Sequence, residues 1–354
     1  MISSRVPVTV LTGFLGSGKT TLLQRLLRAE GGQNVAVLIN ELGEIGLDHL
    51  LVKAVTETAV VLQNGCICCT IRSDLQRGLR DLIDGRSRGD VPPFDRILLE
   101  TTGLADPFPI VQTVANDLML RRQVRLANIV TTVDVLNGAD QLDSHDESRR
   151  QAVIADRLVL TKTDLVPAER ATALHSRLSA LNPTAIVYDA QVETSLWDVL
   201  LGSDSFDETT RTSETRRWLR CLPAIDAAED VVRSRHEEDI HTFSIRVERP
   251  IDWTVFGVWL SALVHRHGAK ILRIKGLLDV PDANGPVVLN TVQRHIHPPF
   301  HLDAWPDQDR ASRLVFIVKG LDPDNIRRSL DGVLASAGPL KRTELLPDLA
   351  TAGA

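Results

Sequence analysis

The chain lacks the features that mark several large classes of protein. It has four cysteines in 354 residues, three of them within four positions, which excludes a disulfide framework. No apolar run approaches the roughly 20 residues of a membrane-spanning helix, and no signal-type segment opens the sequence. The net charge of −6 provides no basic excess for a general nucleic-acid scaffold. We therefore expect a cytoplasmic protein that binds neither membrane nor nucleic acid.

The composition is that of an ordinary globular protein, 43% hydrophobic and 24% charged, in a chain long enough for about two domains. Short apolar runs alternate with helical patterns from residue 6 to 201. The expected strands are 6–11, 35–39, 60–62, 97–99, 129–133, 158–160 and 185–187, and the expected helices include 21–27, 74–83, 168–181 and 195–201. This alternation predicts an α/β domain with a mainly parallel sheet, flanking helices and a ligand site at the carboxyl ends of the strands.

The pattern changes after the first domain, which we place at residues 1–201. Residues 202–240 are polar with little periodicity and are predicted to form a linker. Residues 241–345 predict a smaller α+β domain with a largely antiparallel sheet, and 346–354 a flexible tail. Its expected strands are 242–247, 270–278, 287–292 and 313–318, with helices at 253–264 and 325–334.

The most informative motif follows the first expected strand and fits the phosphate-binding pattern G-x-x-x-x-G-K-[ST]. Its glycines bring backbone N–H groups against phosphate oxygens, and the following helix directs its positive end at the same anion. Lys19 supplies charge to the β- and γ-phosphates, and the Thr20 hydroxyl can bind Mg²⁺. The predicted nucleotide-binding residues of this loop are Gly13, Gly16, Ser17, Gly18, Lys19, Thr20 and Thr21.

Two further strand ends supply nucleotide-binding candidates. Glu100 closes the strand at 97–99, where a carboxylate can hold a water bound to Mg²⁺, and Gly103 can bring a backbone N–H to the γ-phosphate. The sequence Thr161-Lys162-Thr163-Asp164 follows the strand at 158–160. There the Asp164 carboxylate can accept two hydrogen bonds from guanine, which adenine cannot offer, and the Lys162 stem can pack over the base. The loop 188–191 is placed to complete the base pocket.

A thiol cluster follows the expected strand at 60–62. Cys66, Cys68 and Cys69 form a C-x-C-C pattern whose soft thiolates suit Zn²⁺ or Cu⁺, while a redox switch and inert packing stay open as alternatives. Structural zinc usually takes four ligands, so three cysteines favour a site that receives and releases metal. Glu41, a histidine, water or a partner's side chain could complete it. Glu41 lies in the acidic turn 40–46, at the position of a switch loop.

These motifs occur in the order seen in the CobW-like family of metal-handling P-loop GTPases, which the chain resembles in both domains. The resemblance implies slow GTP hydrolysis with GTP and Mg²⁺, Lys19, Thr20 and Glu100 as catalytic residues, and Thr20 on Mg²⁺. It also implies delivery of zinc, or else cobalt or iron, to a client metalloprotein. By the same resemblance the three cysteines match the metal motif and Glu41 matches a switch acid that couples metal to nucleotide.

The chain departs from the family pattern at two points. Thr161 replaces the asparagine of the guanine motif, and residues 202–241 contain only His236 and His241 in place of a histidine-rich stretch. A metal store is therefore not expected, whereas a single high-affinity site is.

Other readings stay open. A P-loop small-molecule kinase would use the same phosphate loop, and a redox-regulated nucleotide-binding adaptor would use Cys68 or Cys69 in a reversible disulfide. His295, His297 and His301 form either a second metal site, a client contact or ordinary surface and packing positions. The sequence also leaves open whether two chains form a homodimer.

Overall fold

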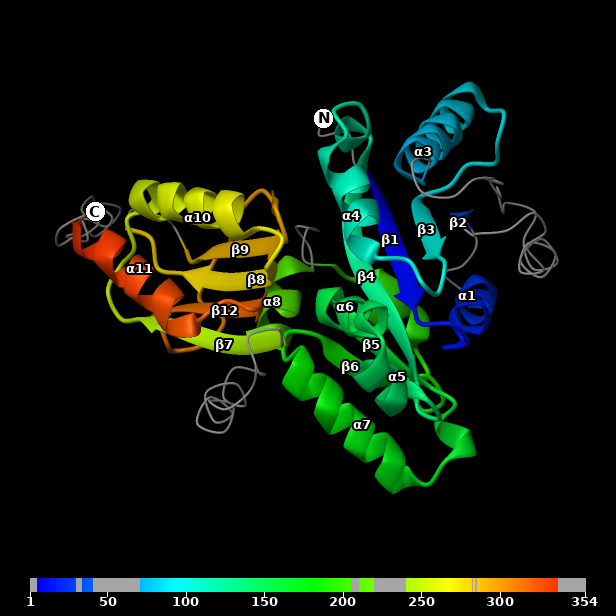
Figure 1. Cartoon of the computed structure of the whole chain (residues 1–354). Helices are drawn as coiled ribbons and strands as arrows, with labels where there is room; N and C mark the ends of the chain where they lie inside the picture. The colour runs from blue at the N-terminus through cyan, green and yellow to red at the C-terminus, as the bar shows by residue number, and fades with distance from the viewer. Residues whose placement is uncertain are drawn as a thin grey trace, which may run out of the picture. The chain divides into compact units, whose positions relative to one another are not determined.

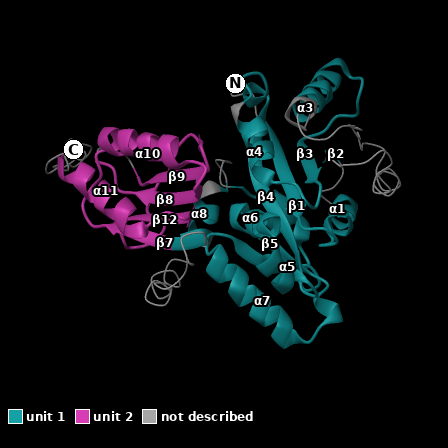
Figure 2. Cartoon of the chain, in the orientation of Figure 1, with its two compact units in different colours: residues 1–242 teal, residues 243–354 magenta. Residues whose placement is uncertain are grey.

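The computed structural model describes residues 5–29, 34–40, 71–204, 210–219, 240–281, 283 and 285–336. These residues fall into two compact units, 1–242 and 243–354 (Figures 1 and 2). None of the helices within the described ranges has the length and apolar character needed to cross a membrane.

The first unit is built on a six-stranded parallel sheet with the order β2-β3-β1-β4-β5-β6. Its strands are β1 (Val6–Gly13), β2 (Val35–Asn40), β3 (Arg96–Thr101), β4 (Val124–Asp134), β5 (Arg157–Thr161) and β6 (Ile186–Asp189). The parallel α/β fold predicted from the alternating pattern is therefore confirmed. The expected strand at 60–62 lies outside the described residues.

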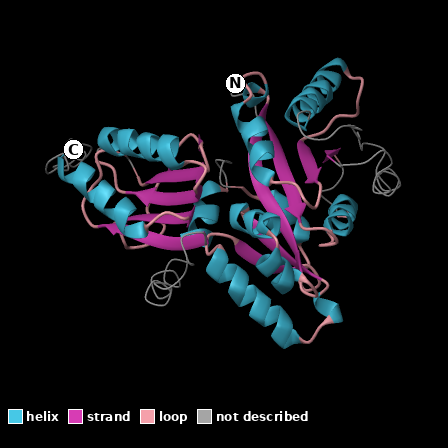
Figure 3. Ribbon diagram, in the orientation of Figure 1, coloured by secondary structure: helices cyan, strands magenta, loops and turns pink. Residues whose placement is uncertain are grey.

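Helices cover the sheet (Figure 3). They are α1 (Lys19–Arg28), α3 (Ile71–Arg88), α4 (Pro107–Asn116), α5 (Gly138–Ser144), α6 (Asp146–Ile154), α7 (Ala168–Leu181) and α8 (Arg211–Leu219). Leucines of α1 join β1, β2 and β5 in one apolar cluster, and α5, α6 and α7 join β4 and β5 in another. Short 3-10 helices at Leu120–Arg122 and Thr163–Leu165 and a π-helical turn at Asp198–Gly202 complete the unit.

Helix α8 lies inside the interval predicted as a linker. Its Glu214 forms a buried ion pair with Arg157 at the start of β5 and accepts a hydrogen bond from Ser203 Oγ at 2.8 Å. Residues 202–240 therefore contain a short helix that polar contacts hold against the sheet. The spacing of apolar residues in the sequence does not indicate such contacts.

The second unit is an antiparallel sheet with two helices on one face (Figure 3). Its elements are β7 (Ile240–Val247, which begins in the first unit), α10 (Trp253–His267), β8 (Ile271–Leu278), β9 (Val287–Val292), β10 (His295–Ile296), β11 (Phe300–His301), β12 (Ser312–Lys319) and α11 (Pro323–Ser336). One cluster joins both helices to β7, β8, β9 and β12, with Phe243 stacked on Phe316. The predicted antiparallel α+β architecture is thus confirmed.

Candidate functional site

The phosphate loop forms a tight turn between β1 and α1. Gly16 and Gly18 adopt positive φ angles of 71° and 89°, and Gly18 immediately precedes the first helical residue, Lys19. At Gly13 a Cβ atom would lie 2.2 Å from Thr132 Oγ1, so only glycine allows the loop to approach β4 this closely. The loop therefore presents main chain and a helix N-terminus, the arrangement that binds phosphate.

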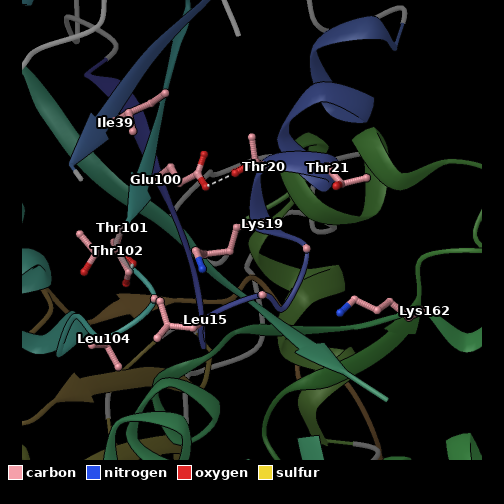
Figure 4. A pocket seen from close by; sticks show the side chains of 13 residues that line it. Leu15, Lys19, Thr20, Thr21, Ile39, Glu100, Thr101, Thr102, Leu104 and Lys162 are labelled. Carbon is pink, nitrogen blue, oxygen red and sulfur yellow. Dashed lines mark hydrogen bonds between the residues drawn. The ribbon is translucent and has the colours of Figure 1, made fainter. Parts of the chain in front are cut away.

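Lys19 folds back over the loop. Its Nζ donates to the carbonyl oxygens of Gly13 at 3.0 Å and Phe14 at 3.1 Å. The side chain also lines a cavity of about 530 Å³ at the carboxyl ends of β1 and β3 (Figure 4). The residues around this cavity are Leu15, Gly16, Gly18, Lys19, Thr20, Thr21, Ile39, Glu100, Thr101, Thr102, Gly103, Leu104 and Lys162. Most of the predicted phosphate-side residues thus surround one cavity.

Glu100 and Thr20 meet on one wall of the cavity. Strand β3 pairs with β1 so that Glu100 lies beside Leu11, and Thr20 Oγ1 donates to Glu100 Oε1 at 3.0 Å (Figure 4). The Glu100 side chain is buried, with 4% of the residue exposed. A carboxylate and a hydroxyl side by side are hard oxygen donors, the type that Mg²⁺ binds. The donor set present therefore fits a magnesium ion at this wall.

The loop after β3 rests on the phosphate loop. A Cβ atom on Gly103 would lie 2.7 Å from the backbone nitrogen of Leu15 and 2.8 Å from its Cα, so no larger residue fits without moving one loop. Gly103 also lines the cavity. The predicted position of Gly103 beside the phosphates is consistent with this contact.

Thr161, the departure from the guanine motif, joins the base-side loop to the phosphate loop. Its Oγ1 donates to the carbonyl oxygen of Ser17 at 2.8 Å, and the residue is 7% exposed. Ser17 is also hydrogen-bonded through its hydroxyl to Thr132 on β4 at 2.7 Å. The threonine hydroxyl therefore makes a buried hydrogen bond that a side-chain amide could also make.

Lys162 is held in place by Asp134 at the end of β4. Lys162 adopts a left-handed φ of 60°, and its Nζ lies 2.6 Å from Asp134 Oδ2. Burial alone would raise the pKa of Asp134. The hydrogen bonds from Lys162, Asn137 and the Leu136 backbone outweigh burial and lower this pKa below the ordinary carboxyl value. Asp134 is therefore ionised at neutral pH and holds the ammonium of Lys162, a residue that lines the cavity.

Asp164 is exposed beside the loop after β6. Its Oδ1 accepts a hydrogen bond from Gln191 Nε2 at 2.9 Å. Asp189 accepts from Thr163 Oγ1 at 2.7 Å and from the Gln191 backbone at 2.8 Å, which ties this loop to the guanine motif. The loop that is predicted to complete the base pocket therefore contacts Thr163 and Asp164, and the base pocket itself stays a prediction.

Replacing Asp134 with asparagine removes the charge that pairs with Lys162. We expect the free energy of unfolding at neutral pH to fall by about 1.5–3 kcal/mol, as for other hydrogen bonds to charged groups. The folded-state pKa is depressed, so the wild-type advantage is present above the ordinary pKa of 3.8 and is lost as pH falls through the lower folded value. Urea titrations at several pH values measure this difference.

The matched control is Asp143→Asn, because Asp143 pairs with Arg177 on the exposed surface. It should change stability little. An Asp134→Asn protein as stable as the wild type at neutral pH would contradict the structural role of the pair.

The predicted transition-metal ligands Cys66, Cys68, Cys69 and Glu41 lie outside the described residues. Among the residues that are described, no group of three or more histidine, cysteine, aspartate or glutamate side chains could hold a metal. The rings of His295 and His297 lie 4.4 Å apart, edge to face, and His301 is exposed on β11. Burial lowers the pKa of His295. This pair of rings does not by itself make a second metal site.

The prediction from sequence missed Thr132 and Asp134. For Asp134 a signal was available, because an acid lies at the end of the apolar strand β4 as Glu100 lies at the end of β3. Thr132 carries no such signal, since its contact with Ser17 depends on strand pairing.

Comparisons with known proteins match both parts of the chain. Residues 7–189 match the family model "CobW/HypB/UreG, nucleotide-binding domain", and residues 240–334 match "Cobalamin synthesis protein cobW C-terminal domain". The zinc chaperone YjiA of Escherichia coli is 31% identical over 328 residues, which are 93% of this chain and 98% of that protein.

Two further matches are informative. The zinc-regulated GTPase metalloprotein activator 1 of Schizosaccharomyces pombe is 39% identical over 191 residues, 52% of this chain and 45% of that protein. A solved structure of a zinc-bound triple mutant of the YjiA GTPase, with one glutamate and two cysteines replaced by alanine, has a TM-score of 0.69 and 28% identity. The match covers 93% of this chain and 99% of the solved one.

Proposed function

The chain belongs to the CobW/HypB/UreG family of P-loop GTPases, and from this premise we propose that it hydrolyses GTP in order to deliver zinc to a client metalloprotein. The observation that carries the proposal is the single cavity that joins the phosphate loop, the Thr20–Glu100 pair and Lys162 of the guanine motif. The names of the relatives, zinc chaperone and zinc-regulated GTPase metalloprotein activator, favour this proposal over a kinase or a redox adaptor.

Lys19 and the start of α1 bind the triphosphate. The Lys19 ammonium is already held over the loop by the carbonyl groups of Gly13 and Phe14, so little ordering is needed when phosphate arrives. The first N–H groups of α1 lack partners within the helix and point their partial positive charge at the same place. These groups stabilise the charge that moves between the phosphates during hydrolysis.

Thr20 and Glu100 are the residues that would hold Mg²⁺. When bound, this ion neutralises charge on the phosphate oxygens. Thr20 contributes its hydroxyl, and Glu100 contributes a buried carboxylate that its position at the end of β3 fixes in place. Gly103 lies against the phosphate loop and provides a backbone N–H near the terminal phosphate.

Asp164 reads the base and Lys162 packs over it. Guanine offers two donors on one edge, N1–H and the 2-amino group, and the two Asp164 oxygens can accept both. Adenine would leave the carboxylate unpaired, so GTP is selected over ATP. Thr161 keeps this loop in register with the phosphate loop through Ser17, and thus the base and phosphate sites are set at a fixed separation.

Zinc is the cargo, and Cys66, Cys68 and Cys69 with Glu41 are the proposed ligands. Thiolates bind zinc strongly, and a set with fewer than four protein thiolates leaves a position through which a client ligand can enter. Because Glu41 directly follows β2 in the sequence, and Ile39 of β2 lines the cavity, zinc and the terminal phosphate can influence one another. Hydrolysis would then favour zinc release.

Replacing all three clustered cysteines with alanine tests the zinc site. We expect zinc affinity to fall by at least about 100-fold, since loss of second-shell partners alone costs 10–100-fold. The affinity is measured by competition with a chelator, and the ligand type by the thiolate-to-metal absorption of the cobalt-substituted protein. The YjiA triple mutant is zinc-bound, so the number of bound ions is not a sufficient readout.

The control is Cys221→Ala, which removes the remaining cysteine of the chain and should leave the tight site unchanged. If the triple variant binds zinc as tightly as the wild type, with unchanged thiolate absorption in the Cys221→Ala background, the cysteine assignment is wrong.

A further inference from the structure

Helix α6 supports the two loops that face the phosphates. It packs beside α4 and against β1 and β4 (Figure 1). The residue that precedes it, His145, stacks on Phe14 of the phosphate loop with ring centroids 4.6 Å apart and an interplanar angle of 27°. The start of α6 therefore contacts the phosphate loop directly.

Gln151, one turn before the end of α6, holds the loop after β3. Its Nε2 donates to the carbonyl oxygens of Gly103 at 3.1 Å and Ala105 at 3.0 Å. The residue is only 1% exposed, and its own backbone carbonyl accepts a hydrogen bond from Thr131 on β4 at 2.8 Å. The backbone of Gln151 is thus held by β4, and the amino group of its side chain points at the loop after β3.

The orientation of this amide follows from its partners. Both neighbouring groups are carbonyl oxygens, which accept only, so the amino group and not the amide oxygen must face them. The Gln151 Oε1 atom is buried and has no hydrogen-bond partner among the described residues. Gln151 therefore acts as a double donor, which a carboxylate or an apolar side chain of the same size cannot do.

The neighbouring residue of α6 fixes the far end of the same loop. Arg150 Nη1 donates to Asp106 Oδ2 at 2.9 Å, and Asp106 Oδ1 caps α4 by accepting from the Phe108 backbone at 3.0 Å. Residues 103–106 are thereby held at both ends by one turn of α6. The same segment presents Gly103 to Leu15, where no Cβ atom would fit.

We propose that Gln151 is a positioning residue for GTP hydrolysis, holding the main chain at Gly103 in the place where it meets the terminal phosphate. The inference rests on the proposed GTPase function and extends it, because α6 then couples the phosphate loop to the loop after β3. Gln151 is not among the described residues that line the cavity, and it acts through Gly103 and Ala105.

Gln151→Leu tests this role. It keeps the approximate volume of the side chain but leaves two buried carbonyl groups without donors. We expect kcat for GTP to fall by about 10-fold to 100-fold, the scale of a misplacement near 1 Å. The dissociation constant for GDP should stay within about 3-fold of wild type, since the phosphate loop and the base loop are untouched.

Asn128→Leu is the matched control. Asn128 is another buried amide, and its Nδ2 donates to two carbonyl oxygens outside α6, those of Leu200 and Ser203. Its loss should lower thermal stability comparably without lowering kcat at a temperature where the protein is folded. Equal kcat losses in the two folded variants, or wild-type kcat in Gln151→Leu, would overturn the inference.

Gln151→Glu provides a second readout that does not depend on the first variant being folded. An ionised carboxylate repels both carbonyl groups, whereas a protonated carboxyl can donate to one of them. The ratio of its kcat to that of the wild type should therefore rise as pH falls from about 8 to about 5.5. A ratio independent of pH would contradict the donor role. Wild-type protein without any GTP turnover would refute the proposed function instead, and the two failures are therefore distinguishable.

Discussion

Asp164→Asn is expected to lower the affinity for GTP by roughly 10²- to 10⁴-fold and to raise that for xanthosine triphosphate. Two hydrogen bonds to an ionised acceptor contribute about 1.5–3 kcal/mol each, and each 1.4 kcal/mol is tenfold in affinity. The asparagine amide presents one donor and one acceptor, so it mismatches the donor pair of guanine and matches xanthine, whose 2-position is an acceptor. Competition of both nucleotides against a fluorescent guanine analogue measures the change.

As a control, ATP binding is measured for the wild type and for Asp164→Asn, and neither protein should bind ATP well. The exposed variant Asp143→Asn carries the same chemical change elsewhere on the domain and should keep wild-type nucleotide preference. Gln191→Ala removes the donor that occupies Asp164 Oδ1 and should not reduce discrimination against adenine. Unchanged GTP preference in Asp164→Asn would show that the base is read elsewhere.

Glu100→Gln is expected to lower kcat for GTP by about 10²- to 10³-fold, comparable to the loss of one fixed electrostatic group in other enzymes. The amide is nearly isosteric and can still accept from Thr20, so the hydrogen bond at 3.0 Å need not be lost. What is removed is the negative charge that we propose holds the divalent ion near the phosphates. The variant should therefore need a higher Mg²⁺ concentration for half-maximal turnover.

Substitutions at Thr20 test the role of its hydroxyl group separately from the role of the Glu100 charge. Thr20→Ser keeps the hydroxyl and should remain within a few-fold of wild type, whereas Thr20→Val should lose turnover and show the same shift in Mg²⁺ requirement as Glu100→Gln. If Glu100→Gln hydrolyses GTP at the wild-type rate at low Mg²⁺, Glu100 has no part in holding the ion.

The features that sequence reasoning predicted are those fixed by local pattern. The glycine turn at Gly13–Gly18 requires positive φ angles that the motif itself specifies. Glu100 could be placed near Thr20 because parallel strands bring their carboxyl ends to one edge, and the observed register of β1 and β3 does so. The parallel sheet with flanking helices followed from the alternation of apolar runs and helices.

The features that were missed depend on contacts distant in sequence. Helix α6 has little apolar periodicity, and its role arises from Gln151, whose partners lie nearly 50 positions earlier in the chain. Helix α4 was not predicted because Pro107 and Pro109 fall in its first turn, where proline is compatible with a helix capped by Asp106. Helix α8 is held by the buried ion pair of Glu214 with Arg157, and no local sequence pattern predicts this contact.

The substitution at Thr161 shows how a departure from a motif can preserve its geometry. The Thr161 hydroxyl reaches the Ser17 carbonyl at 2.8 Å, so the threonine keeps a hydrogen bond between its own loop and the phosphate loop.

The central claim is that the guanine nucleotide and the thiol-bound zinc ion change each other's affinity. Titrating zinc in a chelator-buffered solution, with and without a non-hydrolysable GTP analogue, and titrating the analogue with and without zinc, tests it directly. We expect the affinity to change by the same factor in both titrations, between about 5-fold and 150-fold, because coupling between two sites is reciprocal. Zinc affinity that is identical in the two nucleotide states, together with analogue affinity that is identical with and without zinc, would contradict it.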